Sequence, residues 1–223
     1  MSDLLHEVDE VMRQERMEKF WAANKNYIVG FIIGTILLTA VISGYKSWNT
    51  GVQEKQTAQI ITLQNADNYP ENILKTEKLT LRPALRGVVL LQAGGAFLDK
   101  DNNEDALKLY KRAANDKSLP NELNHLGRLM SVRLLIDKDD QDGASLLETL
   151  KPVIADTKSP WTSHARLEAS VISANKLSDL ETALKHLKTV EDTAGLPESL
   201  YKRAKALNHI YSLKQKTSEN TGS

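Results

Sequence analysis

The feature that most constrains this chain is an uncharged stretch of nineteen residues, from Tyr27 to Tyr45. At about 1.5 Å per helical residue it extends about 28 Å, which matches the hydrocarbon core of a bilayer. Lys25 and Lys46 close it on the two sides, and aromatic residues flank it where lipid headgroups would lie. The alternative is a buried helix of a soluble protein, but such helices rarely run this long without a polar face. The stretch therefore predicts a single transmembrane helix over residues 27–45.

Two glycines within this stretch, Gly30 and Gly34, form a GxxxG pattern. Glycines at this spacing let two membrane helices approach closely, so this face is a candidate for helix packing in the bilayer. The alternative is that they are the ordinary glycines of a membrane helix, because chance matches to this short pattern are common.

The segments on the two sides of the span differ in size and charge. Residues 1–26 carry more acidic than basic side chains, and their apolar residues recur at helical spacing, which predicts a cytoplasmic amphipathic helix. Residues 46–216 provide room for one sizeable folded domain, and the polar end at 217–223 is expected to be a disordered tail. Arginines and lysines are more frequent just before the span than just after it. This bias predicts a cytoplasmic N-terminus and a domain across the membrane, in the periplasm if the source is a Gram-negative bacterium.

The composition argues against several classes of function. The part from Asn49 onward has 24 basic and 23 acidic side chains, so no basic surface is available for sequence-independent nucleic-acid binding. The absence of cysteine excludes disulfides, thiol nucleophiles and cysteine-ligated zinc. Motifs for nucleotide binding, serine hydrolysis and zinc hydrolysis are missing, and the five histidines lack ligand spacing. We therefore expect no catalytic residue, no metal, no cofactor and no small-molecule substrate.

Four prolines set a period in the region after the span. Each precedes an apolar run with helical spacing, which is the position where the missing N–H of proline costs nothing. Their separations are 37, 40 and 37 residues, for Pro83, Pro120, Pro160 and Pro197. A period near 38 residues is typical of stacked helix pairs. The last unit, from Pro197 to Lys214, is expected to be a single capping helix.

Small residues support the same reading. An alanine in each second helix, Ala106, Ala144 and Ala183, is preceded thirteen positions earlier by a small residue in the first helix: Ala93, Ser131 and Ser170. Small side chains are needed where two helices cross closely. We also expect Pro152 to kink or shorten the second helix that contains it. The predicted fold is all-α: one transmembrane helix followed by an α-solenoid of helix hairpins.

One arginine on each expected first helix is a candidate for partner binding. In stacked helix pairs the first helices line the concave face, where guanidinium groups would meet the carboxylates of a bound chain. The alternative is that these arginines only make up the solvated faces of their helices. The candidates are Arg86, Arg128, Arg166 and Arg203. Trp161, just after a repeat-starting proline, is expected to pack between repeats.

The order of these segments, with several short patches, resembles the family of ancillary subunits of the SecYEG translocon. The patches are EVDEVMRQERMEKFW, the span ending in GYKSW, SLPNELNHLGRL, SPWTSHARLEAS and GLPESLYKRAKAL. The resemblance implies a single-pass inner-membrane protein, with its N-terminus in the cytoplasm and a periplasmic tetratricopeptide-like domain. It also implies the translocon, periplasmic chaperones and secreted polypeptides as partners. The chain departs from the tetratricopeptide consensus in its longer period and in lacking the expected Trp and Tyr of the first helix.

Two hypotheses about function follow. The first is a membrane-anchored interaction scaffold, an ancillary translocon subunit that assists the handover of secreted proteins to periplasmic chaperones. The second is a structural or stress-regulatory adaptor of the cell envelope, whose cytoplasmic helix binds a soluble regulator. An enzyme is the least favoured class, because no cluster of titratable residues suggests acid–base or nucleophilic chemistry.

The predicted topology can be tested with a reporter that is active only outside the cytoplasm. The charge bias predicts that the reporter works when fused after Asn68 and fails when fused after Glu15. The opposite pattern would contradict a cytoplasmic N-terminus. Extra lysines placed after Trp48 should reduce correct insertion, because they compete with the basic residues before the span.

Overall fold

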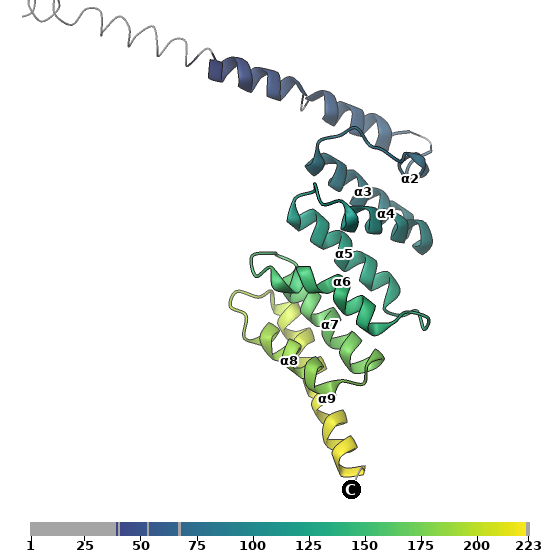
Figure 1. Ribbon diagram of the computed structural model, residues 1–223, viewed down its shortest axis with the longest axis vertical. Helices are drawn as coiled ribbons and strands as arrows, with labels where there is room; N and C mark the ends of the chain where they lie inside the picture. Colours follow the sequence, from purple (N-terminus) through teal and green to yellow (C-terminus); the bar gives the residue numbers. More distant parts are fainter. Residues whose placement is uncertain (1–38, 40, 53, 67, 222–223) are drawn as a thin grey trace, which may run out of the picture. The chain divides into compact units, whose positions relative to one another are not determined.

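The computed structural model describes residues 39, 41–52, 54–66 and 68–221 (Figure 1). Of the expected span over residues 27–45, only residues 39 and 41–45 belong to the described part, and all of these are helical. The expected helix in residues 1–26 and the Gly30 and Gly34 pair lie outside it. No described helix combines the length and the apolar character that crossing a membrane requires.

The chain divides into two compact units, residues 1–56 and residues 57–223. In the first unit, residues 41–52 and 54–56 are helical. Apolar side chains on this helical stretch are largely open, with exposed fractions of 69% at Val41, 57% at Ile42 and 67% at both Tyr45 and Trp48. These four exposed apolar side chains lie close together along the stretch, at positions 41, 42, 45 and 48.

The second unit begins with helical residues 57–64 and continues through eight helices. These are α2 (Glu71–Lys75), α3 (Pro83–Leu98), α4 (Asn103–Asn115), α5 (Asn121–Leu135), α6 (Gly143–Ala155), α7 (Thr162–Lys176), α8 (Leu180–Glu191) and α9 (Glu198–Thr221). Every regular element in the described part is a helix, so the all-α prediction is confirmed.

Two different signals start the helices of the second unit. A proline stands at or just before the start of α3, α5, α7 and α9, as the sequence predicts. The helices between them begin with side-chain caps, in which Asn102, Asp142 and Asp179 accept hydrogen bonds from the first backbone N–H groups of α4, α6 and α8. Both devices deal with the unpaired N–H groups of a first turn. The helices therefore alternate between two types, which we call first helices (α3, α5, α7, α9) and second helices (α4, α6, α8).

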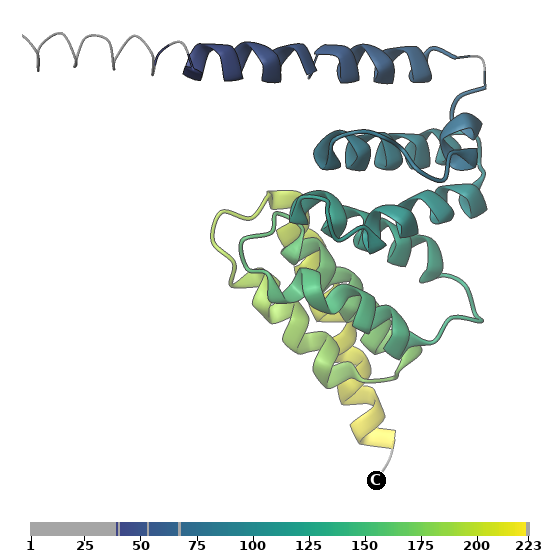
Figure 2. The same cartoon turned by 45° about the horizontal axis from the view of Figure 1, so that its top comes forward.

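The helices pack in chain order (Figures 1 and 2). From α3 to α9, each helix contacts the next. Each first helix also contacts the following first helix, whereas the second helices make no comparable contacts with one another within this unit. Helices on the inner side of a curved stack lie closer together than helices on its outer side. The first helices therefore form the inner side of a stack of helix pairs.

Close approach between these helices depends on residues with little or no side chain. A Cβ atom added at Gly94 of α3 would lie 2.6 Å from the Tyr110 ring of α4, and one at Gly127 of α5 would lie 2.9 Å from Ala113. The predicted crossing residues Ala93, Ser131 and Ser170 are all buried. The tight packing at these positions explains why small residues recur in the first helices.

The structure corrects one of the three crossing alanines. Ala106 and Ala183 are fully buried, but Ala144 is exposed. Ala106 and Ala183 each follow the capping residue of their helix by four positions, and the fourth position after the cap Asp142 is Leu146, which is 3% exposed. A shift of two residues turns a side chain by about 200° around a helix. Ala144 was therefore assigned to the wrong face.

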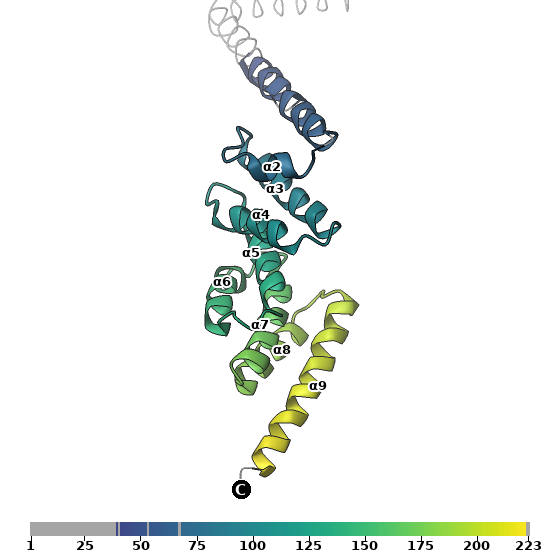
Figure 3. The same ribbon diagram turned by 90° about the vertical axis from the view of Figure 1, so that its right-hand side faces the viewer.

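Two further expectations concern Pro152 and the end of the chain. Pro152 lies inside α6, which ends three residues later at Ala155. The predicted disordered tail is wrong for residues 217–221, because α9 continues to Thr221. Hydroxyl groups of Thr217 and Ser218 donate to backbone carbonyls one turn earlier, at Leu213 and Lys214. The end of α9 projects past α8 in Figure 3.

The corrected register predicts different effects for one substitution at two alanines. Ala183→Phe should lower the free energy of unfolding by about 1–3 kcal/mol, because the ring does not fit the buried crossing of α7 and α8. Ala144→Phe, on an exposed surface of α6, should change it by less than about 0.5 kcal/mol. Urea unfolding followed by circular dichroism measures both values. Equal losses in the two variants would contradict the register.

Candidate functional site

The four predicted arginines do not share one surface. Arg86 pairs with Asp116, with 2.8 Å between Nε and Oδ2. Arg128 donates from Nε to Oδ1 of Asn124 on its own helix, at 2.9 Å. Arg166 acts electrostatically on His186 of α8, so it lies toward a second helix. Arg203 is the fourth, and it lies beside Glu168 of α7. Their role in partner binding remains a prediction, but the arginines act at separate places.

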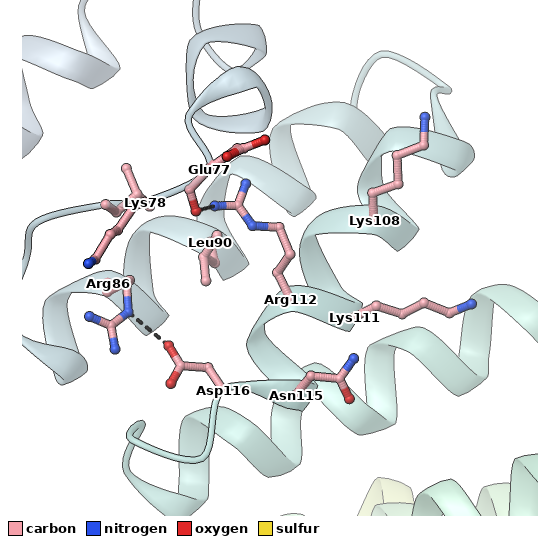
Figure 4. Close-up of a pocket in the computed structure, with 10 residues that line it drawn as sticks. Glu77, Lys78, Arg86, Leu90, Lys108, Lys111, Arg112, Asn115 and Asp116 are labelled. Atoms are coloured by element: carbon pink, nitrogen blue, oxygen red, sulfur yellow. Dashed lines mark hydrogen bonds and ion pairs between the residues drawn. The ribbon is translucent and has the colours of Figure 1, made fainter.

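Arg86 lines a groove of about 560 Å³ beside α3 and α4 (Figure 4). The groove carries five basic side chains and two acidic ones. Its lining consists of Glu77, Lys78, Leu79, Arg86, Leu90, Lys108, Lys111, Arg112, Asn115 and Asp116. We call it the basic groove.

Most of the charge in the basic groove is already committed to the fold. Arg112 donates to the carbonyls of Ile73, Leu74, Thr76 and Glu77, which satisfies the acceptors left open where α2 ends. Burial lowers the pKa of this guanidinium. Arg86 holds Asp116 and also donates to the Leu81 carbonyl. Together with hydrogen bonds from Ser118, Arg86 holds the pKa of Asp116 below its usual value. Arg86, Arg112 and Asp116 of the groove therefore serve first of all to stabilise the fold.

Three lysines remain, of which Lys108 pairs with Glu104 and Asp105 on its own helix. The other two provide the binding capacity of the groove. Lys78 and Lys111 are exposed and make no hydrogen bond or ion pair within the described part of the chain. In Figure 4 their side chains extend away from each other, so they do not converge on one point. Lysines placed this way attract an acidic surface broadly but do not form a binding pocket for one small anion.

A second charged cluster joins three first helices. Glu168 of α7 is only 4% exposed, and its Oε1 accepts a hydrogen bond from Nε of Arg133 in α5 at 2.9 Å. Nη2 of Arg203 in α9 lies 3.7 Å from the same oxygen. A buried carboxylate needs such partners, because an unpaired charge in the interior is strongly unfavourable. We call Arg133, Glu168 and Arg203 the charge ladder.

The charge ladder fixes which side chains line the inner side of the stack. Residues at i, i+4 and i+7 share one face of a helix. Each member of the charge ladder therefore identifies the other side chains on its face. Arg133 shares its face with Leu126 and Met130, Glu168 with His164 and Val171, and Arg203 with Leu207; the side chains of Leu126, Met130, His164, Val171 and Leu207 are half-buried. We call these eight residues the first-helix face. It combines apolar side chains with two guanidinium groups and one carboxylate.

The chemistry of the first-helix face suits binding and not catalysis. Burial and the neighbouring Arg133 lower the pKa of His164, so its imidazole stays neutral near pH 7. Arg203 is half-exposed and makes no hydrogen bond within the described residues, so its N–H groups can reach an external carboxylate. No group of acidic and histidine side chains in the described part is placed to hold a metal ion.

The sequence analysis did not single out Arg133, the arginine of α5 that pairs with Glu168. Arg128 and Arg133 both lie on α5, but five residues separate them, which is about 140° around the helix. The residue that points to Arg133 is Glu168, which stands between Leu167 and Ala169, because a carboxylate that becomes buried requires a basic partner. Trp161 packs between repeats as predicted, with Nε1 donating to the Glu122 carbonyl at 2.8 Å.

Two arginines of α5 offer a matched test of the charge ladder. Arg133→Met should lower the free energy of unfolding by about 1.5–3 kcal/mol, because it removes a hydrogen bond to a buried carboxylate. Arg128→Met should cost less than about 1 kcal/mol, because its partner is the neutral amide of Asn124. Chemical unfolding of the two variants measures the difference. An equal cost, or a larger one for Arg128→Met, would contradict this assignment.

Comparison with protein-family models, with curated proteins and with solved structures finds no match to the chain. The resemblance to ancillary translocon subunits therefore rests on the short sequence patches and on the order of the segments.

Proposed function

We propose that the chain is a membrane-anchored protein-interaction scaffold, an ancillary subunit of the SecYEG translocon. In this proposal residues 27–45 cross the inner membrane once, and the stack of helix pairs is a tetratricopeptide-like solenoid in the periplasm. Its partners are the translocon, secreted polypeptides and periplasmic chaperones. The basis for the partners and the compartment is the sequence resemblance.

The observation that carries the binding role is the first-helix face. It draws on three helices that follow one another in the stack, so it offers several contacts along a line and no single deep pocket. Apolar side chains from Leu126 to Leu207 suit the apolar residues of an unfolded segment, and Arg203 suits a carboxylate. An extended polypeptide matches such a surface better than a compact ligand does.

The anchor is supported by the sequence and by the first unit. Val41, Ile42, Tyr45 and Trp48 are exposed on a helical stretch at the end of the predicted span. Rings of Tyr45 and Trp48 lie 6.3 Å apart, at the place where an aromatic belt would meet the headgroups. These exposed apolar side chains are what a membrane anchor requires at the edge of the bilayer.

Removing one charge from the first-helix face tests this function. Arg203→Gln should weaken capture of a denatured secreted protein by the full-length chain about fivefold, the equivalent of about 1 kcal/mol for one charge-assisted contact. Arg166→Gln is the matched control, because Arg166 lies toward α8 and should leave capture unchanged. Binding is measured with the protein in detergent or nanodiscs, and unchanged melting temperatures would show that both variants fold.

A deletion separates this proposal from the adaptor alternative. Removing residues 1–18 should leave capture unchanged, because a partner beyond the membrane does not meet that segment. If Arg203→Gln were harmless and the deletion abolished partner binding, the adaptor function would replace the scaffold function.

A further inference from the structure

The last described helix, α9, is apolar on two opposite faces. On one face Ala204 and Tyr211 are buried against α7 and α8. On the other, Ile210 is 47% exposed and Leu213 is 51% exposed. Together with the exposed Ala206 and with Thr217 they follow the spacing i, i+4, i+7 and i+11, which is one straight stripe along a helix. We call these four residues the outer stripe.

The outer stripe of α9 corresponds to residues of α7 against which the following helices pack. In α7, Ala165 and Ile172 face the core shared with α5 and α6, whereas Leu167 and Ala174 face α8 and α9. The buried residues of α9, Ala204 and Tyr211, follow Ala165 and Ile172 by 39 positions. The same shift takes Leu167 to Ala206 and Ala174 to Leu213. The outer stripe is therefore the side of α9 on which another helix would stack.

Basic side chains border the outer stripe on both sides. At 100° per residue, Lys202, Lys205 and Lys216 lie along one edge, and Arg203 and Lys214 lie along the other. Glu198 is the acidic side chain of the first turn, and it already pairs with Lys202 at 2.7 Å. Beside the stripe lies a shallow hollow of about 590 Å³, lined by Ile210, Leu213, Lys214, Thr217 and Ser218. An occupant must be apolar along its centre and acidic along its edges.

We propose that the outer stripe binds an amphipathic helix with acidic flanks from a partner protein. That helix stacks on α9 as α9 itself stacks on α7. Two copies of this chain are disfavoured as the occupant, because joining two outer stripes would bring lysines against lysines. An anionic lipid surface matches the charge, but it does not require the repeat register that places Ala206 and Leu213. The outer stripe and the first-helix face share only the bordering Arg203, and the inference does not depend on the function proposed for that face.

A pair of designed peptides tests the proposal on the full chain in phosphatidylcholine nanodiscs. One fluorescent peptide of about 20 residues, long enough to form a helix, carries leucines on one face and glutamates on both flanks. The matched peptide carries lysines in place of the glutamates. Anisotropy should show the acidic peptide binding at least about tenfold more tightly than the basic one, with empty nanodiscs as the blank.

Substitutions then assign the binding to the outer stripe. Ile210→Ser with Leu213→Ser should weaken binding of the acidic peptide at least about tenfold without lowering the melting temperature, because both side chains are exposed. Ile61→Ser is the matched control, since Ile61 is 52% exposed elsewhere in the same unit, and it should change nothing. Reversing Lys202, Lys205 and Lys216 to Glu should abolish the preference for the acidic peptide.

Several results would overturn the proposal. Equal binding of the two peptides, no binding of either, or an equal loss in Ile61→Ser would exclude an acid-flanked helix as the occupant. A dimer in sedimentation that Ile210→Ser with Leu213→Ser disrupts would assign the stripe to a second copy. Binding to phosphatidylglycerol vesicles that the same double variant abolishes, without peptide binding, would assign it to lipid.

Discussion

The architecture of the second unit depends on how closely its helices approach. At Gly94 and Gly127 a single Cβ atom would collide with the neighbouring helix, and Ala183 is fully buried at a comparable crossing. Because first and second helices meet at these small residues, each pair is narrow and the first helices come into contact along one side of the stack. That contact is what brings Arg133, Glu168 and Arg203 from three helices to one place. If the helices crossed at a larger distance, Arg133, Glu168 and Arg203 would lie too far apart to interact.

Much of this fold could be predicted from local rules. Proline before an apolar run predicted the starts of four helices, because a missing N–H is harmless only there. Asn and Asp are also common helix caps, and Asn102, Asp142 and Asp179 cap the helices that begin after polar links. These signals act within a few residues of the chain. For the same reason they predict where a helix begins but not which of its faces is buried.

The sequence alone could not show which face of each helix is buried. Ala144 is two residues away from the buried position that Leu146 fills, and Arg128 is five residues away from Arg133, which binds the buried carboxylate. At 100° per residue such shifts change the face completely, and only tertiary packing decides between them. The extension of α9 to Thr221 was missed because a polar composition predicts disorder, although Thr and Ser hydroxyls can also bond to their own helix.

Hydrogen–deuterium exchange on the full-length protein, alone and with the purified translocon and a secreted client, tests the binding role most directly. The account predicts that the client slows exchange in the segments that carry the first-helix face, residues 126–133 in α5, 164–171 in α7 and 203–207 in α9. The second helices α4, α6 and α8 should exchange as before. Protection confined to residues before the uncharged span, with no change in α5, α7 or α9, would contradict it.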